Sequence, residues 1–138
     1  FTQGKISEAE AISYAIEHAN ITNVNIAIEV EVKTEEGALA AVESFQKRKL
    51  KNPFIILLDN FTPERAGKIV REIRHSERSE ESTDPSAKPQ DDSRIFFEAS
   101  GGITLGNVTD FAKTGVDVIS IGALTHSPKA VDLSLDIY

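Results

Sequence analysis

The sequence alternates between two hydrophobic periods, and this alternation is the feature that most limits its possible folds. In residues 25–33, aliphatic side chains at the even positions alternate with mostly charged side chains at the odd positions, and this period of two is that of a strand. Residues 8–19 instead carry apolar side chains at helical spacing. The same exchange recurs along the chain, so the expected order is a helix, three strand–helix pairs and a final strand. This order is typical of right-handed βαβ units around a parallel sheet, and we expect an α/β fold.

Polar residues mark where the helices should begin. Ser7 and Glu10 are spaced as a capping box, in which each side chain satisfies the other residue's amide. Thr34 is expected to cap the second helix, and Thr62 precedes Pro63 at the start of the third. The side chains expected on the buried faces of the four helices are Ile12, Ala15, Ile16 and Ala19; Leu39, Val42 and Phe45; Ala66, Ile69, Val70 and Ile73; and Leu105, Val108, Phe111 and Ala112.

The expected strands are too few for a closed barrel. Residues 54–58 form a continuous apolar run, which suits a parallel strand covered on both faces. Residues 95–98 and 116–121 are the remaining candidates after 25–33. A closed (β/α) barrel normally has eight strands. The chain is therefore either a small open α/β sheet or part of a (β/α) barrel whose first strands lie before Phe1.

Residues 75–94 break the alternation. Their sequence, HSERSEESTDPSAKPQDDSR, contains one apolar residue, Ala87. Such a segment buries too little apolar surface to offset the entropy of ordering, and we expect a disordered polar insertion. A tolerated insertion in a surface loop is the favoured interpretation, and a regulatory or docking loop is the alternative.

Composition excludes several classes of protein. A net charge of −7 argues against a general nucleic-acid or anionic-membrane binder. The absence of Cys excludes disulfides, a thiolate nucleophile and Cys-based metal centres. No apolar run approaches the roughly 20 residues needed to span a bilayer, and we expect a cytoplasmic protein. Because the chain starts at Phe1 and contains no Met, we also expect a processed chain or a fragment.

Glu29 and Glu31 share one face of the first expected strand. A half-exposed strand with a solvated acidic face would explain both residues. In a βα arrangement, however, that face is not solvent, and an ionised carboxylate there needs a partner or a cation. In a barrel, Glu31 lies closer than Glu29 to the C-terminal rim, where active sites are built. This context favours Glu31 as a ligand for a metal ion or for sugar hydroxyls.

Asp59 ends the next expected strand. Polar residues at the C-terminal ends of parallel strands line the ligand crevice, although Asp-Asn is also ordinary turn chemistry. The two interpretations have equal weight for Asp59 alone. Because Glu31 and Asp59 fall on consecutive strands, they are well placed to hold one Mg²⁺, which needs few carboxylates and shares its shell with waters and phosphate oxygens.

The segment EASGGIT at 98–104 follows a strand pattern and opens a helix pattern. Its two glycines let the backbone approach an anion, and the Ser100 hydroxyl can add a donor. A tight turn with positive φ is the simpler explanation. Gly122 and Ala123 repeat the arrangement after the next strand. Two adjacent turns of this kind match the phosphate site often found at the last two strands of (β/α) barrels.

Four segments together resemble the C-terminal half of the quinolinate phosphoribosyltransferase family, also called nicotinate-nucleotide pyrophosphorylase (carboxylating). They are EVEV at 29–32, LLDN at 57–60, EASGGI at 98–103 and TGVDVISIGALTHS at 114–127. The resemblance covers essentially the whole chain except 75–94, and the motifs occur in the family's order.

The resemblance implies an enzyme of de novo NAD biosynthesis. It would join quinolinate to 5-phosphoribosyl-1-pyrophosphate (PRPP), forming nicotinate mononucleotide, CO₂ and pyrophosphate, with Mg²⁺. It implies a homodimer or larger assembly of chains with an N-terminal α+β domain and an incomplete barrel. Glu31 and Asp59 would lie near the ribose and the Mg²⁺–pyrophosphate. The phosphate-binding turns would contain Ser100, Gly101 and Gly102, together with Gly122 and Ala123.

In this family the N-terminal domain and the Arg, Lys and His residues that bind quinolinate precede the matched region. We therefore expect residues 1–138 to be the C-terminal barrel portion, interrupted by the insertion at 75–94, and not to turn over quinolinate alone. One alternative is the related transferase-like protein found with molybdenum transport, whose acceptor differs. Another is a non-catalytic half-barrel that at most binds phosphate.

Overall fold

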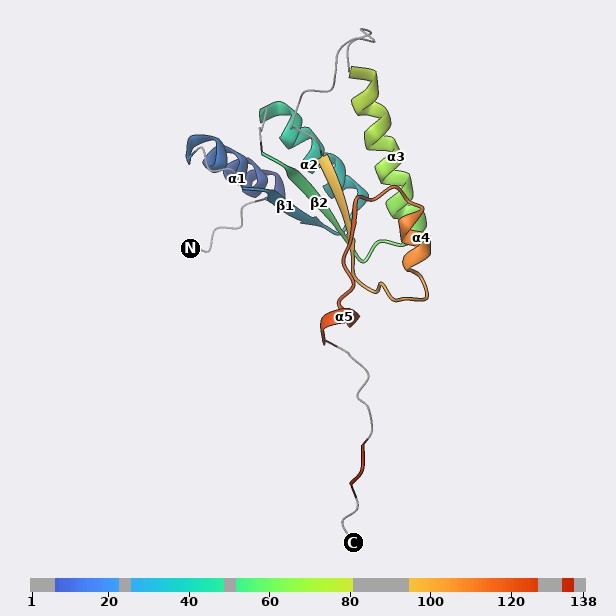
Figure 1. Ribbon diagram of the computed structural model, residues 1–138. Helices are drawn as coiled ribbons and strands as arrows, with labels where there is room; N and C mark the ends of the chain where they lie inside the picture. Colours follow the sequence, from blue (N-terminus) through green and yellow to red (C-terminus); the bar gives the residue numbers. More distant parts are fainter. Residues whose placement is uncertain (1–6, 23–25, 49–51, 81–94, 127–132, 136–138) are drawn as a thin grey trace, which may run out of the picture.

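The computed structural model describes residues 7–22, 26–48, 52–80, 95–126 and 133–135. Helices and strands alternate along the chain (Figure 1). The elements are α1 (Glu8–Thr22), β1 (Ile28–Val32), α2 (Glu35–Arg48), β2 (Phe54–Asp59), α3 (Pro63–Glu80), β3 (Ile95–Ser100), α4 (Val108–Ala112), β4 (Val118–Ile119) and α5 (Ala123–His126). Among the described residues, no helix is long and apolar enough to cross a membrane.

The four strands form one parallel sheet in the order β1-β2-β3-β4. Each strand lies beside the strand that follows it in the chain, as successive βα units require. The α/β prediction is therefore confirmed, and the four parallel strands are consistent with a part of a (β/α) barrel.

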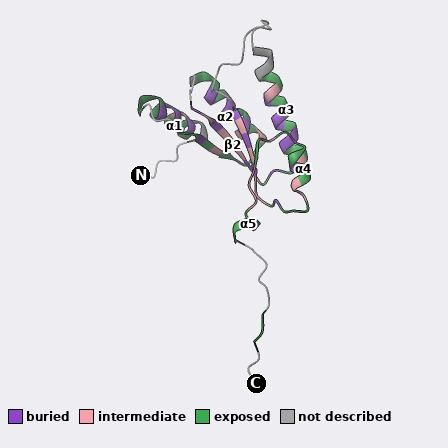
Figure 2. Cartoon of the chain, in the orientation of Figure 1, coloured by how far each residue is buried: buried purple, intermediate pink, exposed green. Residues whose placement is uncertain are grey.

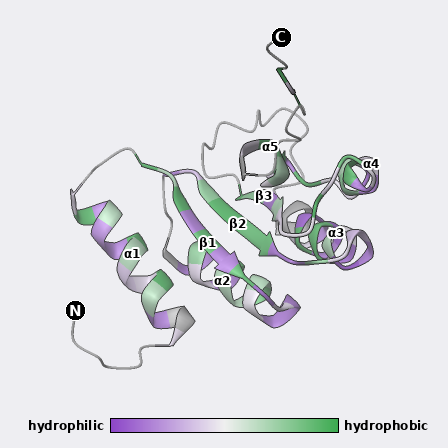
Figure 3. Cartoon of the chain, turned by 90° about the horizontal axis from the view of Figure 1, so that it is seen from below, coloured by the Kyte–Doolittle hydropathy of each residue, from purple (hydrophilic) through white to green (hydrophobic). Residues whose placement is uncertain are grey.

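The two faces of this sheet differ. The covered face consists of Ile28, Val30, Val32, Phe54, Ile56, Leu58, Ile95, Phe97 and Ala99, and it packs against the helices. The open face consists of Glu29, Glu31, Ile55, Leu57, Asp59, Phe96, Glu98 and Ser100, all partly buried or exposed. Figure 3 shows α2 running along β1 and β2, and Figure 2 shows buried residues where the helices meet the strands.

The expected helix starts are confirmed. The Ser7 amide donates to Glu10 Oε2 at 2.8 Å and the Glu10 amide donates to Ser7 Oγ at 3.3 Å, which completes the capping box. The Ser7 hydroxyl also donates to Glu10 Oε2 at 2.8 Å, and the hydrogen bonds from the Ser7 amide and hydroxyl lower the pKa of Glu10. The Gly37 amide donates to Thr34 Oγ1 at 3.0 Å, and the Arg65 amide donates to Thr62 Oγ1 at 3.4 Å. Local sequence therefore sets where α1, α2 and α3 begin.

Four of the expected core positions are wrong. Ala15, Leu39, Leu105 and Ala112 are exposed, with Leu39 at 42% and Leu105 at 81%. Leu105 lies in the turn before α4, because this helix has only five residues and begins at Val108. The buried faces of α2 and α4 are narrower than helical spacing suggested, and small residues such as Ala38 and Ala41 let α2 approach the sheet closely.

The polar segment at 75–94 differs from expectation at its start. α3 continues to Glu80 instead of ending before His75, and the Ser76 hydroxyl donates to the carbonyl oxygen of Ile73 at 2.8 Å. The Glu and Arg residues of 75–80 are good helix formers, so polar composition alone did not end the helix. Residues 81–94, the remainder of the expected insertion, lie outside the described residues.

A charged contact connects α3 with the last two strands. Asp117 Oδ2 accepts a hydrogen bond from Arg74 at 2.8 Å and another from the Phe97 amide at 2.9 Å. The Asp117 amide in turn donates to the carbonyl oxygen of Phe97 at 2.9 Å. Because β4 is only two residues long, instead of the six expected at 116–121, Asp117 supplies pairing that the short strand does not.

Candidate functional site

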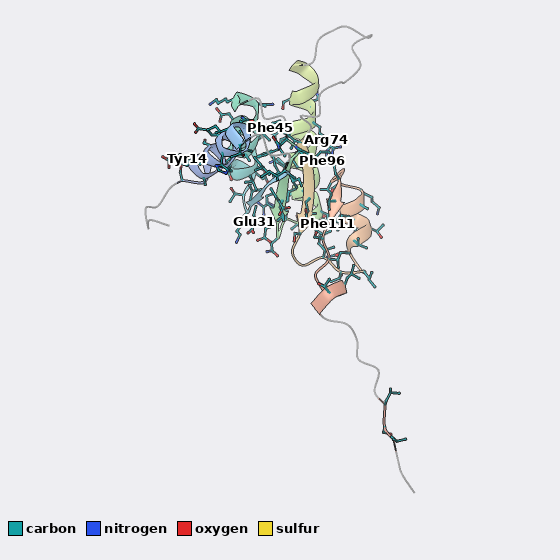
Figure 4. All side chains as sticks on the ribbon, turned by 60° about the vertical axis from the view of Figure 1, so that its left-hand side comes forward. Tyr14, Glu31, Phe45, Arg74, Phe96 and Phe111 are labelled. Carbon is teal, nitrogen blue, oxygen red and sulfur yellow. The ribbon has the colours of Figure 1, made fainter. Side chains whose placement is uncertain are left out.

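Strand register brings the expected site residues to one end of the sheet. Glu31 lies opposite Leu57, Leu57 lies opposite Glu98, and Asp59 lies opposite Ser100. The turn after β3 and helix α5 lie at this same end in Figure 1. Glu31, labelled in Figure 4, projects from β1 toward it. The C-terminal ends of the strands therefore gather the polar residues, as in other parallel sheets.

Glu31 and Asp59 converge on one positive charge. Lys33 Nζ lies 3.3 Å from Glu31 Oε1 and 3.7 Å from Asp59 Oδ2. Hydrogen bonding to Glu31, followed by the charges of Glu31 and Asp59, raises the pKa of Lys33. Two carboxylates from neighbouring strands thus lie close enough to share a single cation.

The expectation that Glu31 is removed from solvent is wrong for this chain. Its side chain is 56% exposed, and Glu29 on the same strand is exposed as well, whereas Asp59 is only 21% exposed. β1 is an edge strand among the described residues, so its open-face side chains have neighbours on one side only. Glu29 lies level with Ile55, further from the strand ends than Glu31.

The turn after β3 contains two consecutive glycines with positive φ. Gly101 and Gly102 have φ values of 87° and 65°, which other residues rarely adopt. Neither glycine's amide forms a hydrogen bond with another described residue, and no atom lies within 4 Å of the Cβ position of Gly102. Ser100 is partly buried at the end of β3, next to these amides. At Gly102 the turn is therefore open enough for a phosphate oxygen to approach its backbone.

This turn does not open directly into a helix, contrary to the prediction. α4 begins at Val108, and an Asn107-centred turn intervenes. Asn107 Oδ1 accepts from the Thr104 amide at 2.8 Å, and Asn107 Nδ2 donates to the Gly102 carbonyl at 3.1 Å. The donors available to an anion are therefore turn amides and not those of a helix N-terminus.

Gly122 and Ala123 follow β4 at the same end of the sheet. Ala123 begins α5, which has four residues, and the Thr125 amide and hydroxyl both donate to the Gly122 carbonyl at 2.9 Å. A glycine turn thus follows each of the last two strands, as expected. The side chains of Glu98 and Ser120 connect these strands, because the Ser120 hydroxyl donates to Glu98 Oε1.

Sequence reasoning did not identify Lys33, Asn60, Glu98 or Ser120 as parts of the site. Lys33 shares the alternating face of Glu29 and Glu31, and this opposite charge two residues from Glu31 was an available signal. The contact between Glu98 and Ser120 has no local signal, because 22 residues separate the two positions.

Comparison with known proteins relates this chain to one family. Residues 3–136 match the model of the quinolinate phosphoribosyl transferase C-terminal domain. The probable nicotinate-nucleotide pyrophosphorylase (carboxylating) of Methanocaldococcus jannaschii is 41% identical over 128 residues, which are 93% of this chain and 38% of that protein. The corresponding enzyme of Rattus norvegicus is 33% identical over 111 residues, covering 80% of this chain and 30% of the rat protein.

A solved structure agrees with these relatives. The nicotinate-nucleotide pyrophosphorylase of Francisella tularensis superposes with a TM-score of 0.60 at 31% identity, over 90% of this chain and 36% of the other. The chain thus spans less than two fifths of the length of these relatives. The order of strands, the glycine turns and the match over residues 3–136 together show that the chain belongs to the quinolinate phosphoribosyltransferase family, whose C-terminal domain it represents.

Proposed function

We propose that this chain forms the PRPP-binding part of a quinolinate phosphoribosyltransferase. The reaction joins quinolinate to PRPP and yields nicotinate mononucleotide, CO₂ and pyrophosphate. The observation that carries the proposal is the convergence of Glu31 and Asp59 on one cation, Lys33 Nζ, at the strand ends where the open turn at Gly101 and Gly102 also lies. A cation and a phosphate are the two charged groups that PRPP with Mg²⁺ would bring to such a site.

Glu31 and Asp59 fit a magnesium ion that arrives with its substrate. Lys33 Nζ is a stand-in cation, and its contacts show that both carboxylates can face one positive charge. The described residues contain no group of three or more His, Cys, Asp or Glu that could hold a metal alone. This pattern suits Mg²⁺, which binds one or two carboxylates and completes its shell with waters and phosphate oxygens. When bound, Mg²⁺ would neutralise charge on the departing pyrophosphate.

The chain's own residues would act by charge and position. Positive charge develops at C1 of the ribose as its bond to the pyrophosphate oxygen breaks, and a nearby carboxylate of Glu31 or Asp59 stabilises that charge. The amides of Gly101 and Gly102, the Ser100 hydroxyl, and the turn at Gly122 and Ala123 would hold phosphate oxygens. The quinolinate nitrogen then bonds to C1. The ring carbon next to this nitrogen then loses CO₂, the pyridinium stabilises the electron pair left on the carbon, and a proton from water takes the place of CO₂.

The resemblance implies that basic residues preceding the matched region bind quinolinate. We therefore expect the 138-residue chain to bind PRPP without forming nicotinate mononucleotide. The same resemblance implies a homodimer or larger assembly for the complete enzyme, a state that light scattering after size-exclusion chromatography measures.

Calorimetry with PRPP tests the proposal. The chain should bind PRPP in the presence of Mg²⁺ and lose affinity when Mg²⁺ is removed. Asp59→Asn and Glu31→Gln should each weaken binding by about tenfold or more, as expected when a metal site loses one of its groups. Glu29→Gln is the matched control, because Glu29 lies on the same strand and face but further from the rim. Absence of PRPP binding, or an equal loss in the control, would contradict the proposal.

A further inference from the structure

Asn60 contacts both parts of the proposed site, the carboxylate of Asp59 and the turn at Gly101 and Gly102. It follows β2 directly, and its φ of 57° makes it the one non-glycine residue with positive φ among those described. The left-handed conformation costs most residues free energy, although Asn tolerates it better than others. Contacts with neighbouring residues must therefore hold Asn60 in this conformation. These contacts are with Asp59 and with the turn that follows β3 at Gly101 and Gly102.

The Asn60 side chain orients Asp59. Asn60 Nδ2 donates to Asp59 Oδ1 at 2.9 Å, whereas the other carboxylate oxygen, Oδ2, faces Lys33 Nζ at 3.7 Å. One oxygen of Asp59 is therefore held by a neutral donor, and the second is turned toward the position of the cation. A hydrogen bond of this kind to a ligating carboxylate normally sets its orientation.

The backbone of Asn60 joins the glycine turn. Its amide donates to the Ser100 carbonyl at 2.8 Å, which extends the pairing of β2 with β3 by one residue. A Cβ atom at Gly101 would lie 2.9 Å from the Asn60 backbone nitrogen and 2.7 Å from Asn60 Cγ. Gly101 is therefore required here by close packing as well as by its φ of 87°.

We propose that Asn60 is a positioning residue that turns Asp59 toward the cation and holds it in register with the turn at Gly101 and Gly102. The cation and phosphate positions then form one rigid unit. This inference rests on the proposed function for the identity of its ligand. It goes further in assigning to Asn60 the coupling between the two halves of the site.

The variant Asn60→Gly distinguishes the proposed role of the side chain, which orients Asp59, from the role of the backbone, which adopts a positive φ in the turn. Glycine adopts positive φ freely and keeps the backbone amide, but it removes the side-chain donor to Asp59. We expect Asn60→Gly to keep the thermal midpoint of the wild type while its affinity for PRPP with Mg²⁺ falls about tenfold. Asn60→Ala should lower both the midpoint and the affinity. Wild-type affinity in Asn60→Gly would overturn the proposal.

A second measurement does not depend on PRPP. Asp59→Asn should shift the NMR signals of the Gly101 and Gly102 amides in the wild-type background, and this shift should largely disappear in the Asn60→Gly background. Such a double-mutant comparison isolates the coupling through Asn60. Equal shifts in both backgrounds would overturn the proposal. If the wild type bound no PRPP, the proposed function would fail, and the NMR result would decide the role of Asn60 by itself.

Discussion

The two faces of the sheet are built from the same strands, yet they have opposite properties. On the covered face, Ile56, Leu58 and Phe97 are fully buried under the helices. On the open face, their sequence neighbours are partly buried or exposed, and Glu31 has 56% of its side chain exposed. Successive side chains point to opposite sides of a strand, so when one residue faces the core, the next residue along the strand faces the candidate site. Stability and proposed function are therefore separated by face and not by region of the chain.

The open face also mixes two kinds of residue. Ile55, Leu57 and Phe96 share this face with acidic residues of β1, β2 and β3, and they are only partly buried. Each apolar side chain on this face contributes less burial than its counterpart on the covered face. We therefore expect substitutions on the two faces to differ in size, and the following predictions test this difference.

The largest effect is expected at Phe97. Phe97→Ala should lower the free energy of unfolding by about 3–5 kcal/mol, because it leaves a cavity in the core. Phe96→Ala, one residue earlier and on the open face, should cost only about 1 kcal/mol. Urea denaturation of both variants measures the difference. Equal costs would show that the open face is as well packed as the covered one.

A smaller loss of stability is expected at Gly101, which follows β3 at the end of the sheet that carries the candidate site. Gly101→Ala should cost about 2–4 kcal/mol, because alanine combines an unfavourable φ with contact against Asn60. Gly102→Ala meets no atom within 4 Å and should cost only about 1–2 kcal/mol for its φ. Thermal unfolding of the pair measures the contribution of close packing. A greater loss in Gly102→Ala would contradict the assignment of the contact to Gly101.

The next smaller loss of stability is expected at Asp117. Asp117→Ala removes the acceptor for Arg74 and for the Phe97 amide and should lower the free energy of unfolding by about 1.5–3 kcal/mol. Asp117→Asn keeps an acceptor oxygen and should lose less. Hydrogen exchange at the Phe97 amide gives a local measurement. Unchanged protection of this amide in Asp117→Ala would exclude Asp117 as the connection between β3 and β4.

The smallest effect is expected at Ser7, away from both faces. Ser7→Ala should cost about 1 kcal/mol at neutral pH by removing the cap of α1. The pKa of Glu10 is lowered in the folded chain, so its contribution is present at neutral pH and is lost as the pH falls through that lowered pKa. Ser7→Ala keeps the amide that donates to Glu10 and removes only the hydroxyl, so the difference between wild type and Ser7→Ala should shrink slightly in acid. Denaturation curves at neutral and acidic pH measure it, and a constant difference would exclude a contribution from the hydrogen bond between the Ser7 hydroxyl and Glu10.

Much of the architecture could be predicted from the sequence. The order of elements, the caps at Ser7, Thr34 and Thr62, and the buried stripe of α3 are all local patterns that the structure confirms. The errors fell where tertiary contacts decide burial. Leu39 and Leu105 have the right spacing for a core face, but the described residues leave them exposed. Helical period gives the direction of a side chain and not the presence of a neighbour.

The candidate site was likewise predictable only in part from the sequence. Glu31, Asp59 and the glycine turns were identifiable from residue type and from position at strand ends, because parallel strands present those ends at one edge. Their mutual arrangement depends on strand register, which brings Asp59 opposite Ser100. Only the tertiary structure decided that Lys33 lies between the two carboxylates and that Asn60 packs on Gly101. Residues on different strands are joined by packing across the sheet, and no local pattern in the sequence records that packing.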